Sequence, residues 1–172
     1  MNYYFSTTLK NLTFETAKEK VTLALKEEGF GVLTNIDVKK TLKKKLGVDF
    51  RPYEILGACN PHFAYKALSA EDKIGIMLPC NVVIEENENG AIEVSAVDPI
   101  ASMGAVGNNN LEEIGEKLLS EFSTNFKMLL EYVDSLPLEQ QEIFLDKLVG
   151  AVDEIDNFIN DLGLNVNDLG VH

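Results

Sequence analysis

The sequence contains few of the residues on which metal and cofactor motifs depend. Among its 172 residues there are no tryptophans, two cysteines and two histidines. Two cysteines are too few for the disulfide framework of a small secreted domain, and neither Cys-x-x-Cys nor Cys-x-x-Cys-His occurs. Glycine-rich nucleotide loops and the Gly-x-Ser-x-Gly elbow are also missing. The sequence therefore does not predict a zinc finger, covalently attached haem, a P-loop enzyme or a serine hydrolase.

Long apolar runs are absent as well. No stretch reaches the roughly 18 apolar residues that a membrane-spanning helix needs. The first residues, Met1–Ser6, lack the basic flank and apolar stretch of a signal peptide. We therefore expect a soluble, cytoplasmic protein with no membrane partner. In that compartment Cys59 and Cys80 should stay reduced.

Basic residues are scarce: 15 Lys and Arg stand against 28 Asp and Glu, for a net charge of −13. This balance argues against a nucleic-acid partner. Residues 1–120 carry 17 acidic and 13 basic side chains, whereas residues 121–172 carry 11 and 2. The difference predicts two segments, an α+β domain over 1–120 and an acidic helical appendage over 121–172.

Periodicity and turn residues predict the elements of the first segment. Strands are expected at residues 3–8, 31–36, 53–58, 74–86 and 91–97. Helices are expected at residues 14–28, 37–46 and 60–68. Asn89-Gly90 is typical of a type I′ hairpin turn between the last two strands, and residues 98–110, which are rich in Gly and Asn, are expected to form a loop.

The second segment is helical in pattern. Helices are expected at residues 111–135 and 138–162, separated by Ser135-Leu136-Pro137. In the second helix apolar residues recur at spacings of three and four, which is typical of a narrow coiled-coil seam. We expect the two helices to form a hairpin.

Two similar cysteine-asparagine segments occur in the first part of the chain. They are Ile55–Pro61 (Ile-Leu-Gly-Ala-Cys-Asn-Pro) and Met77–Val83 (Met-Leu-Pro-Cys-Asn-Val-Val). Together with Leu42–Val48, Val97–Pro99 and Met103, they resemble the signature of the domain-of-unknown-function 302 family over about residues 3–120. The resemblance implies a small fold of the TATA-binding-protein-like kind, with a curved antiparallel sheet of four to five strands and helices on one face. It also implies homodimers, and it implies no established activity.

Cys59 lies where a strand meets the start of a helix, with Asn60 at the N-cap position and Pro61 at the first helical position. Free N–H groups and the helix dipole at that place favour a thiolate, the form that attacks electrophiles and binds metals. The alternative is a small buried hydrophobic residue.

Cys80 shares one strand face with aliphatic residues, so we expect it to be buried. Because the Cys-Asn pair occurs twice, Asn60 and Asn81 are also ligand-binding candidates. If the two cysteines meet at one end of the sheet, they could form a redox pair or a two-thiolate site.

His62 follows Cys59 with Cys-x-x-His spacing, which can bring two metal ligands together on the first turn of a helix. Cys80 or Met103 could add a third ligand to Cys59 and His62, in a soft metal site or a haem site. The candidate metal ligands are therefore Cys59, His62 and Cys80. The alternative for His62 is an exposed surface side chain.

The leading interpretation is a non-enzymatic binding or accessory domain that acts as a homodimer, with a small-molecule, metal or haem site near Cys59 and Cys80. One alternative is a thiol-dependent redox or sulfur-handling enzyme, with Cys59 as nucleophile and Cys80 as resolving partner. Another is a structural oligomer whose C-terminal helices bind a protein partner.

Overall fold

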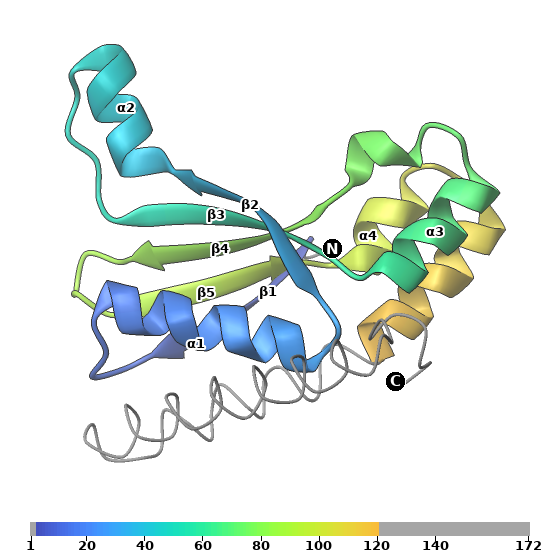
Figure 1. Ribbon diagram of the computed structural model, residues 1–172, viewed down its shortest axis with the longest axis horizontal. Coiled ribbons are helices and arrows are strands. Elements are labelled where there is room, and N and C mark those ends of the chain that lie inside the picture. The colour runs from blue at the N-terminus through green and yellow to red at the C-terminus, as the bar shows by residue number, and fades with distance from the viewer. Residues whose placement is uncertain (1–2, 121–172) are drawn as a thin grey trace, which may run out of the picture.

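The structure, a computed structural model, describes residues 3–120. An open antiparallel sheet lies at its centre, with the strand order β1-β5-β4-β3-β2 (Figure 1). The strands are β1 (Tyr4–Leu9), β2 (Gly31–Asp37), β3 (Tyr53–Cys59), β4 (Cys80–Glu86) and β5 (Ile92–Val97). All four neighbouring pairs are antiparallel. The predicted α+β class and five-stranded sheet are confirmed.

Five short helical elements accompany the sheet. They are α1 (Phe14–Glu27), α2 (Val38–Leu46), α3 (Pro61–Ala70), the 3₁₀ helix η1 (Ile74–Met77) and α4 (Pro99–Gly104). Residues 109–120 are helical as well. The expected helices 111–135 and 138–162 and their hairpin fall, beyond residue 120, outside the described residues.

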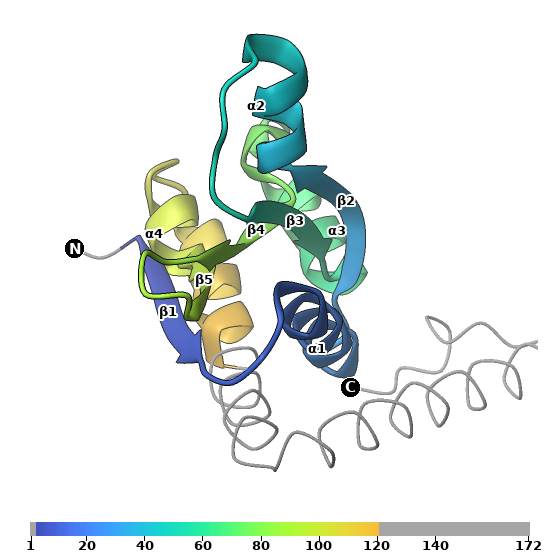
Figure 2. The same cartoon turned by 90° about the vertical axis from the view of Figure 1, so that its left-hand side faces the viewer.

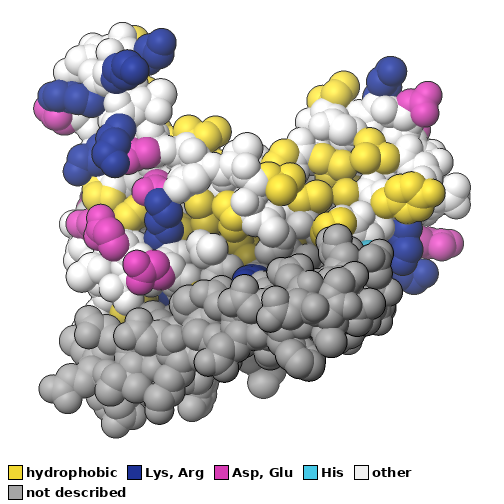
Figure 3. Space-filling model, viewed as in Figure 1, with side chains coloured by type: hydrophobic (Ala, Val, Ile, Leu, Met, Phe, Trp, Pro, Cys, Tyr) yellow, Lys and Arg dark blue, Asp and Glu magenta, His cyan; other side chains and the backbone are white. Residues whose placement is uncertain are grey.

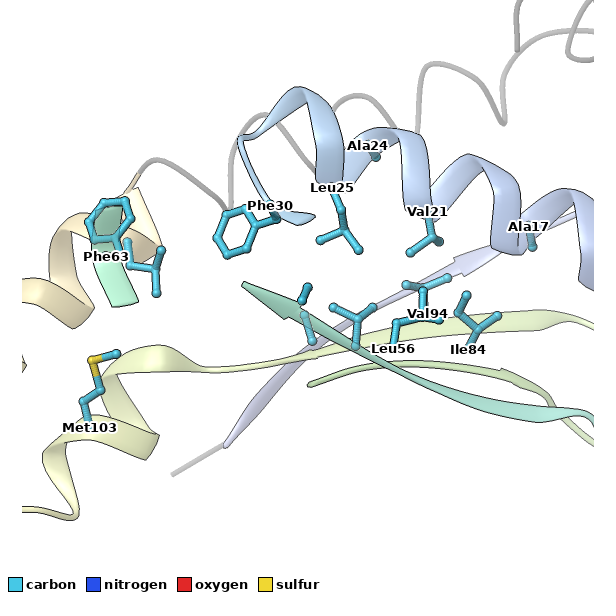
Figure 4. Packing of buried hydrophobic residues seen from close by; sticks show 14 of the residues in the cluster. Ala17, Val21, Ala24, Leu25, Phe30, Leu56, Phe63, Ile84, Val94 and Met103 are labelled. Atoms are coloured by element: carbon cyan, nitrogen blue, oxygen red, sulfur yellow. The ribbon is translucent and has the colours of Figure 1, made fainter. Parts of the chain in front are cut away.

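Helix α1 covers one face of the sheet. The Thr13 hydroxyl accepts a hydrogen bond from the Thr16 N–H at 3.1 Å and caps its first turn. Four apolar side chains of α1 are fully buried: Ala17, Val21, Ala24 and Leu25. They face Leu56, Ile84 and Val94 of the sheet (Figure 4). Burial of each large aliphatic side chain contributes about 1.5–3 kcal/mol to the free energy of folding. The layer between α1 and the sheet is therefore the main hydrophobic core.

Helix α2 lies away from the core, as the two views show (Figures 1 and 2). Asp37 caps its start by accepting a hydrogen bond from the Lys40 N–H at 2.7 Å. Gly47 ends it with a positive φ of 69°. None of its nine residues is buried. The helix forms an arm at one end of the molecule.

The expected long strand 74–86 is wrong in its first half. Residues 74–77 form η1, and the strand starts only at Cys80. Pro79 has no N–H to donate to the ladder, so pairing with β3 begins after it, at Ala58–Cys80. Consequently Ile76, which a strand over 74–86 would place on the same face as Cys80, is 83% exposed.

The turn between β4 and β5 is not of type I′. The Gly90 N–H donates to the Asn87 carbonyl at 3.0 Å, and Gly90 has a φ of 75°, whereas Asn89 is not among the residues with positive φ. The side chain of Asn87 accepts further hydrogen bonds from the N–H groups of Asn89 and Ala91. This pattern is a type I turn followed by a left-handed glycine, which makes a longer hairpin loop.

Residues 98–110 are not a loop throughout. Asp98 accepts hydrogen bonds from the Ile100 N–H at 2.8 Å and the Ala101 N–H at 3.3 Å, and so caps α4. Pro99 occupies the first helical position. Across residues 3–120 no helix is both long and apolar enough to cross a membrane.

Candidate functional site

The two cysteine-asparagine segments lie side by side in the sheet. Strand β3 pairs with β4 so that Gly57 faces Asn81 and Ala58 faces Cys80. The end of β3 continues through Cys59 into α3, and the start of β4 follows η1. The topology therefore places both segments at one end of the molecule, next to α3 and α4 (Figure 1).

Gly57 permits this close pairing. A Cβ atom at Gly57 would lie 2.7 Å from Pro79 Cγ and would also collide with Thr34 Oγ1. Both distances are shorter than real Cβ contacts, so a side chain at this place requires its neighbours to move. The glycine of the first segment thus accommodates the proline of the second.

Cys59, Cys80 and Met103 line one small cavity, which we call the sulfur cavity. Its other lining residues are mostly apolar: Phe30, Ala58, Asn60, Phe63, Ala64, Leu78 and Leu118. The cavity has a volume of about 10 Å³, which matches one water molecule or a bare ion. Cys59 and Cys80 thus line one cavity at one end of the sheet, which is the arrangement that a redox pair or a two-thiolate site needs, but a cavity of this volume is too small for haem.

Both thiols resist ionisation. Burial, and after it the charge of Cys59, raises the pKa of Cys80 to about 11. Burial also raises the pKa of Cys59 above its usual value. At Cys59 burial therefore opposes the thiolate that the place before a helix favours. At the start of α3 the side-chain oxygen of Asn60 accepts the N–H groups of His62 and Phe63.

The other predicted ligands do not join the sulfur cavity. His62 is exposed on the first turn of α3 and does not line it. Asn60 lines it but uses its oxygen for capping. Asn81 is exposed, on the sheet face opposite Cys80. Within residues 3–120 no group of three or more His, Cys, Asp or Glu side chains is arranged to hold a metal ion, so the structure does not bring Cys59, His62 and Cys80 together as one set of ligands.

A much larger hollow lies over the sheet face that α1 leaves open. This open-face groove has a volume of about 580 Å³. Its lining comes from β1, β3, β4, β5, η1 and α4: Tyr3, Tyr4, Tyr53, Ile76, Met77, Leu78, Pro79, Asn81, Val83, Glu85, Glu93, Ser95, Ala96, Val97 and Ser102. Figure 3 shows hydrophobic side chains gathered along the hollow between α2 and the end that carries α3 and α4.

The charged side chains of the open-face groove are all acidic. Glu85 of β4 and Glu93 of β5 lie directly opposite each other in the sheet register. Like charges at directly opposed positions destabilise a sheet. Arg51 compensates Glu85, to which its Nε donates at 2.8 Å. Glu93 accepts a long hydrogen bond of 3.5 Å from the Ser95 hydroxyl.

Tyr53 joins this charged end of the open-face groove. The Arg51 guanidinium lies over its ring, 5.3 Å from the centroid, and over the Phe50 ring at 4.8 Å. Burial, and after it the carboxylate of Glu85, raises the pKa of the Tyr53 hydroxyl. The phenol therefore stays neutral and can donate a hydrogen bond.

The sequence reasoning did not identify the open-face groove. A signal was present, because a sheet with helices on one face must expose the other. Alternation along β4 places Asn81, Val83 and Glu85 on that exposed face, opposite the buried Val82 and Ile84.

Comparisons with known proteins give a family and a fold. The family model described as "Domain of unknown function DUF302" matches residues 5–131, ending beyond the expected limit near residue 120. A crystal structure of the uncharacterized conserved protein DUF302 from Bacillus stearothermophilus is similar, with a TM-score of 0.66 and 29% identity. The match covers 74% of this chain and 98% of that one. No curated protein matches the chain.

Proposed function

The chain belongs to the family of domain of unknown function DUF302, and from this premise we propose that it is a non-enzymatic binding domain for a small, positively charged organic molecule. The open-face groove is the binding surface in this proposal. Its aromatic and acidic lining carries the proposal, and its volume of about 580 Å³ is within the range of about 300–1,000 Å³ that ligand sites commonly have. The sulfur cavity, at about 10 Å³, is too small for such a molecule.

The chemistry of the lining favours a cation. Glu85 and Glu93 supply two carboxylates, and no Lys, Arg or His lines the groove within residues 3–120. Tyr3, Tyr4 and Tyr53 supply aromatic faces, which attract ammonium groups through their π electrons. Because Arg51 already pairs with Glu85, the ammonium group would lie beside Glu93, the carboxylate opposed to Glu85 in the sheet register. The apolar remainder of the ligand would contact Ile76, Met77 and Val83.

The thiol chemistry supports binding over catalysis. A nucleophilic cysteine needs a thiolate, and here burial raises the pKa of both thiols. The thiol-enzyme alternative is therefore the weaker interpretation.

The experiment uses two fluorescent probes with one fluorophore and opposite charge. Dansylcadaverine carries a primary ammonium, and dansylglycine carries a carboxylate. We expect the full chain to bind the ammonium probe and to bind the carboxylate probe at least about tenfold more weakly, which corresponds to about 1.4 kcal/mol. Glu93→Gln should remove most of this preference. Ser95→Trp, placed in the middle of the groove lining, should weaken both probes.

Glu88→Gln is the matched control, because Glu88 is exposed in the β4–β5 hairpin loop and does not line the groove. It removes the same charge and should leave binding unchanged. Equal binding of the two probes, or undiminished binding to Ser95→Trp, would overturn the proposal.

A homodimer is the second part of the proposal, and α2 supports it. A helix of nine residues without a buried side chain is marginal alone. Its flanks expose Ile36, Leu46 and Val48. The arm carries five lysines on a chain of net charge −13, so it is complementary in charge to a second copy. Light scattering should give a dimer for the full chain and a monomer for Leu46→Asp. A dimer for both would exclude α2 from the interface.

A further inference from the structure

Three sulfur-bearing residues from three different elements meet at the sulfur cavity. Cys59 ends β3, Cys80 starts β4 and Met103 lies in α4. Met103 is 3% exposed, and its sulfur points from α4 toward Phe63 of α3 (Figure 4). Ala58 pairs directly with Cys80 in the sheet register, so Cys59 lies one residue beyond the position opposite Cys80, and both cysteines line the cavity. The cavity therefore gathers two thiols and one thioether.

We propose that the sulfur cavity binds one Cu(I) ion through the sulfur atoms of Cys59, Cys80 and Met103. Thiolate and thioether donors are soft ligands, and they select Cu(I) over harder ions. The volume of about 10 Å³ suits a single ion without its own water shell. This site is distinct from the open-face groove, because Cys80 and the groove residue Asn81 alternate along β4.

The lining disfavours other common metals. Mg²⁺ and Ca²⁺ need several oxygen ligands, and Asn60 is the sole oxygen-bearing side chain among the residues lining the cavity. Structural zinc takes four nitrogen or sulfur ligands. The cavity offers three, since His62 is exposed outside it.

The surroundings suit a buried soft ion. Phe30, Phe63, Leu78 and Leu118 form an apolar shell that limits access of water and oxidants. Met103 is held in place by α4, whose first turn Asp98 caps. The third ligand thus comes from a fixed helix.

Binding follows a balanced exchange of protons for metal. Cu(I) forms bonds to the sulfurs of Cys59 and Cys80, each thiol releases one proton to solvent, and the Met103 thioether donates a lone pair without losing a proton. No electron is transferred. Because two protons leave, the dissociation constant should fall about 100-fold for each pH unit over the range where both thiols are protonated in the free protein.

The test is an anaerobic titration of the reduced full chain with Cu(I), using bicinchoninate as the competing coloured chelator. We expect one Cu(I) per chain and the two-proton pH dependence. Cys59→Ser and Cys80→Ser should each weaken binding by more than about 100-fold, since losing even an outer partner of a metal ligand costs about 10–100-fold. Met103→Leu, which keeps the side-chain volume, should weaken it about tenfold, the lower end of that range.

His62→Ala is the control, because this exposed histidine does not line the cavity. It should bind Cu(I) as the unaltered chain does. Far-UV circular dichroism of Met103→Leu checks that the fold is kept. Absence of stoichiometric binding by the unaltered chain overturns the proposal, and so does undiminished binding by both serine variants. A one-proton pH dependence also overturns it, because only one thiol would then be a ligand.

Discussion

Replacing Gly57 with alanine should destabilise the protein by forcing apart the two cysteine-asparagine segments. The added Cβ would lie 2.7 Å from Pro79 Cγ and would collide with Thr34 Oγ1. Overpacking of this kind costs about 1–3 kcal/mol. The reduced freedom of the unfolded chain returns about 0.4–1 kcal/mol. With two clashes at one atom, we expect a net loss of about 2 kcal/mol.

Urea unfolding followed by circular dichroism measures this loss directly. In a thermal scan the same change corresponds to a decrease in Tm of about 4–8 °C for a domain of this size. Gly75→Ala is the matched control, because its Cβ would meet only Leu68 Cδ2 at 3.9 Å, an ordinary contact. It should change the free energy of unfolding by less than about 0.5 kcal/mol.

A second substitution tests the cause. Thr34→Ala removes the hydroxyl that the new Cβ would strike, so the double variant Gly57→Ala/Thr34→Ala should recover part of the lost stability. Residues in contact commonly show coupling energies of about 0.5–3 kcal/mol. If the two substitutions are simply additive, or if Gly57→Ala is as stable as the unaltered chain, the steric explanation is wrong.

Three further predictions follow from the thiols and from α4. Brief alkylation with iodoacetamide and peptide mass mapping should find Cys59 labelled before Cys80, because Cys80 is the more deeply buried and has its pKa raised to about 11; labelling in the reverse order would contradict this assignment. The free energy of unfolding should be steady below about pH 8.5 and then fall by about 2–3 kcal/mol toward pH 11. The reason is that the pKa of Cys80 is raised to about 11 in the folded protein, so this thiol ionises first in the unfolded chain. In Cys80→Ala the decrease should be much smaller, and an unchanged decrease would assign it to other groups. Asp98→Ala should lower the free energy of unfolding by about 0.5–2 kcal/mol, because α4 loses its cap. An unchanged midpoint of urea unfolding would contradict this prediction.

Local chemistry allowed several element boundaries to be predicted. The expected helices begin and end close to the predicted residues: Thr13 caps α1, Gly47 ends α2, and Asn60-Pro61 starts α3. In each case a few neighbouring residues determine the outcome, because a cap is a contact within one turn. Asp98-Pro99 is the same kind of helix start as Asn60-Pro61. The Gly- and Asn-rich residues that follow are typical of a loop, and for this reason α4 was not predicted.

Predictions that depended on the environment of a side chain were less successful. The ionisation of Cys59 was judged from its place before a helix, where a dipole favours the thiolate. In the folded chain Asn60 already satisfies the first N–H groups, and burial raises the pKa of the thiol. Burial arises from distant parts of the chain, so the spacing of residues in the sequence does not reveal it.

The open-face groove was missed for a related reason. Its acidic end joins Tyr53 of β3, Glu85 of β4 and Glu93 of β5, three residues that no short motif connects. The pairing register brings them together, and that register is known only once the strands are aligned. Identification of the strands alone could indicate an exposed face but could not show which charges would be opposed on it.

The repeated Cys-Asn pair therefore serves different purposes at its different positions. Alternation along β4 sends Cys80 toward the core and Asn81 toward the open-face groove. At the end of β3, Cys59 lines the sulfur cavity while Asn60 caps α3. The two cysteines converge although the two asparagines do not. Because the two cysteines line the sulfur cavity and not the open-face groove, substitutions at the cysteines should alter Cu(I) binding without altering the binding of the ammonium probe. The reverse should hold for Glu93→Gln, which makes the two proposals independent in experiment.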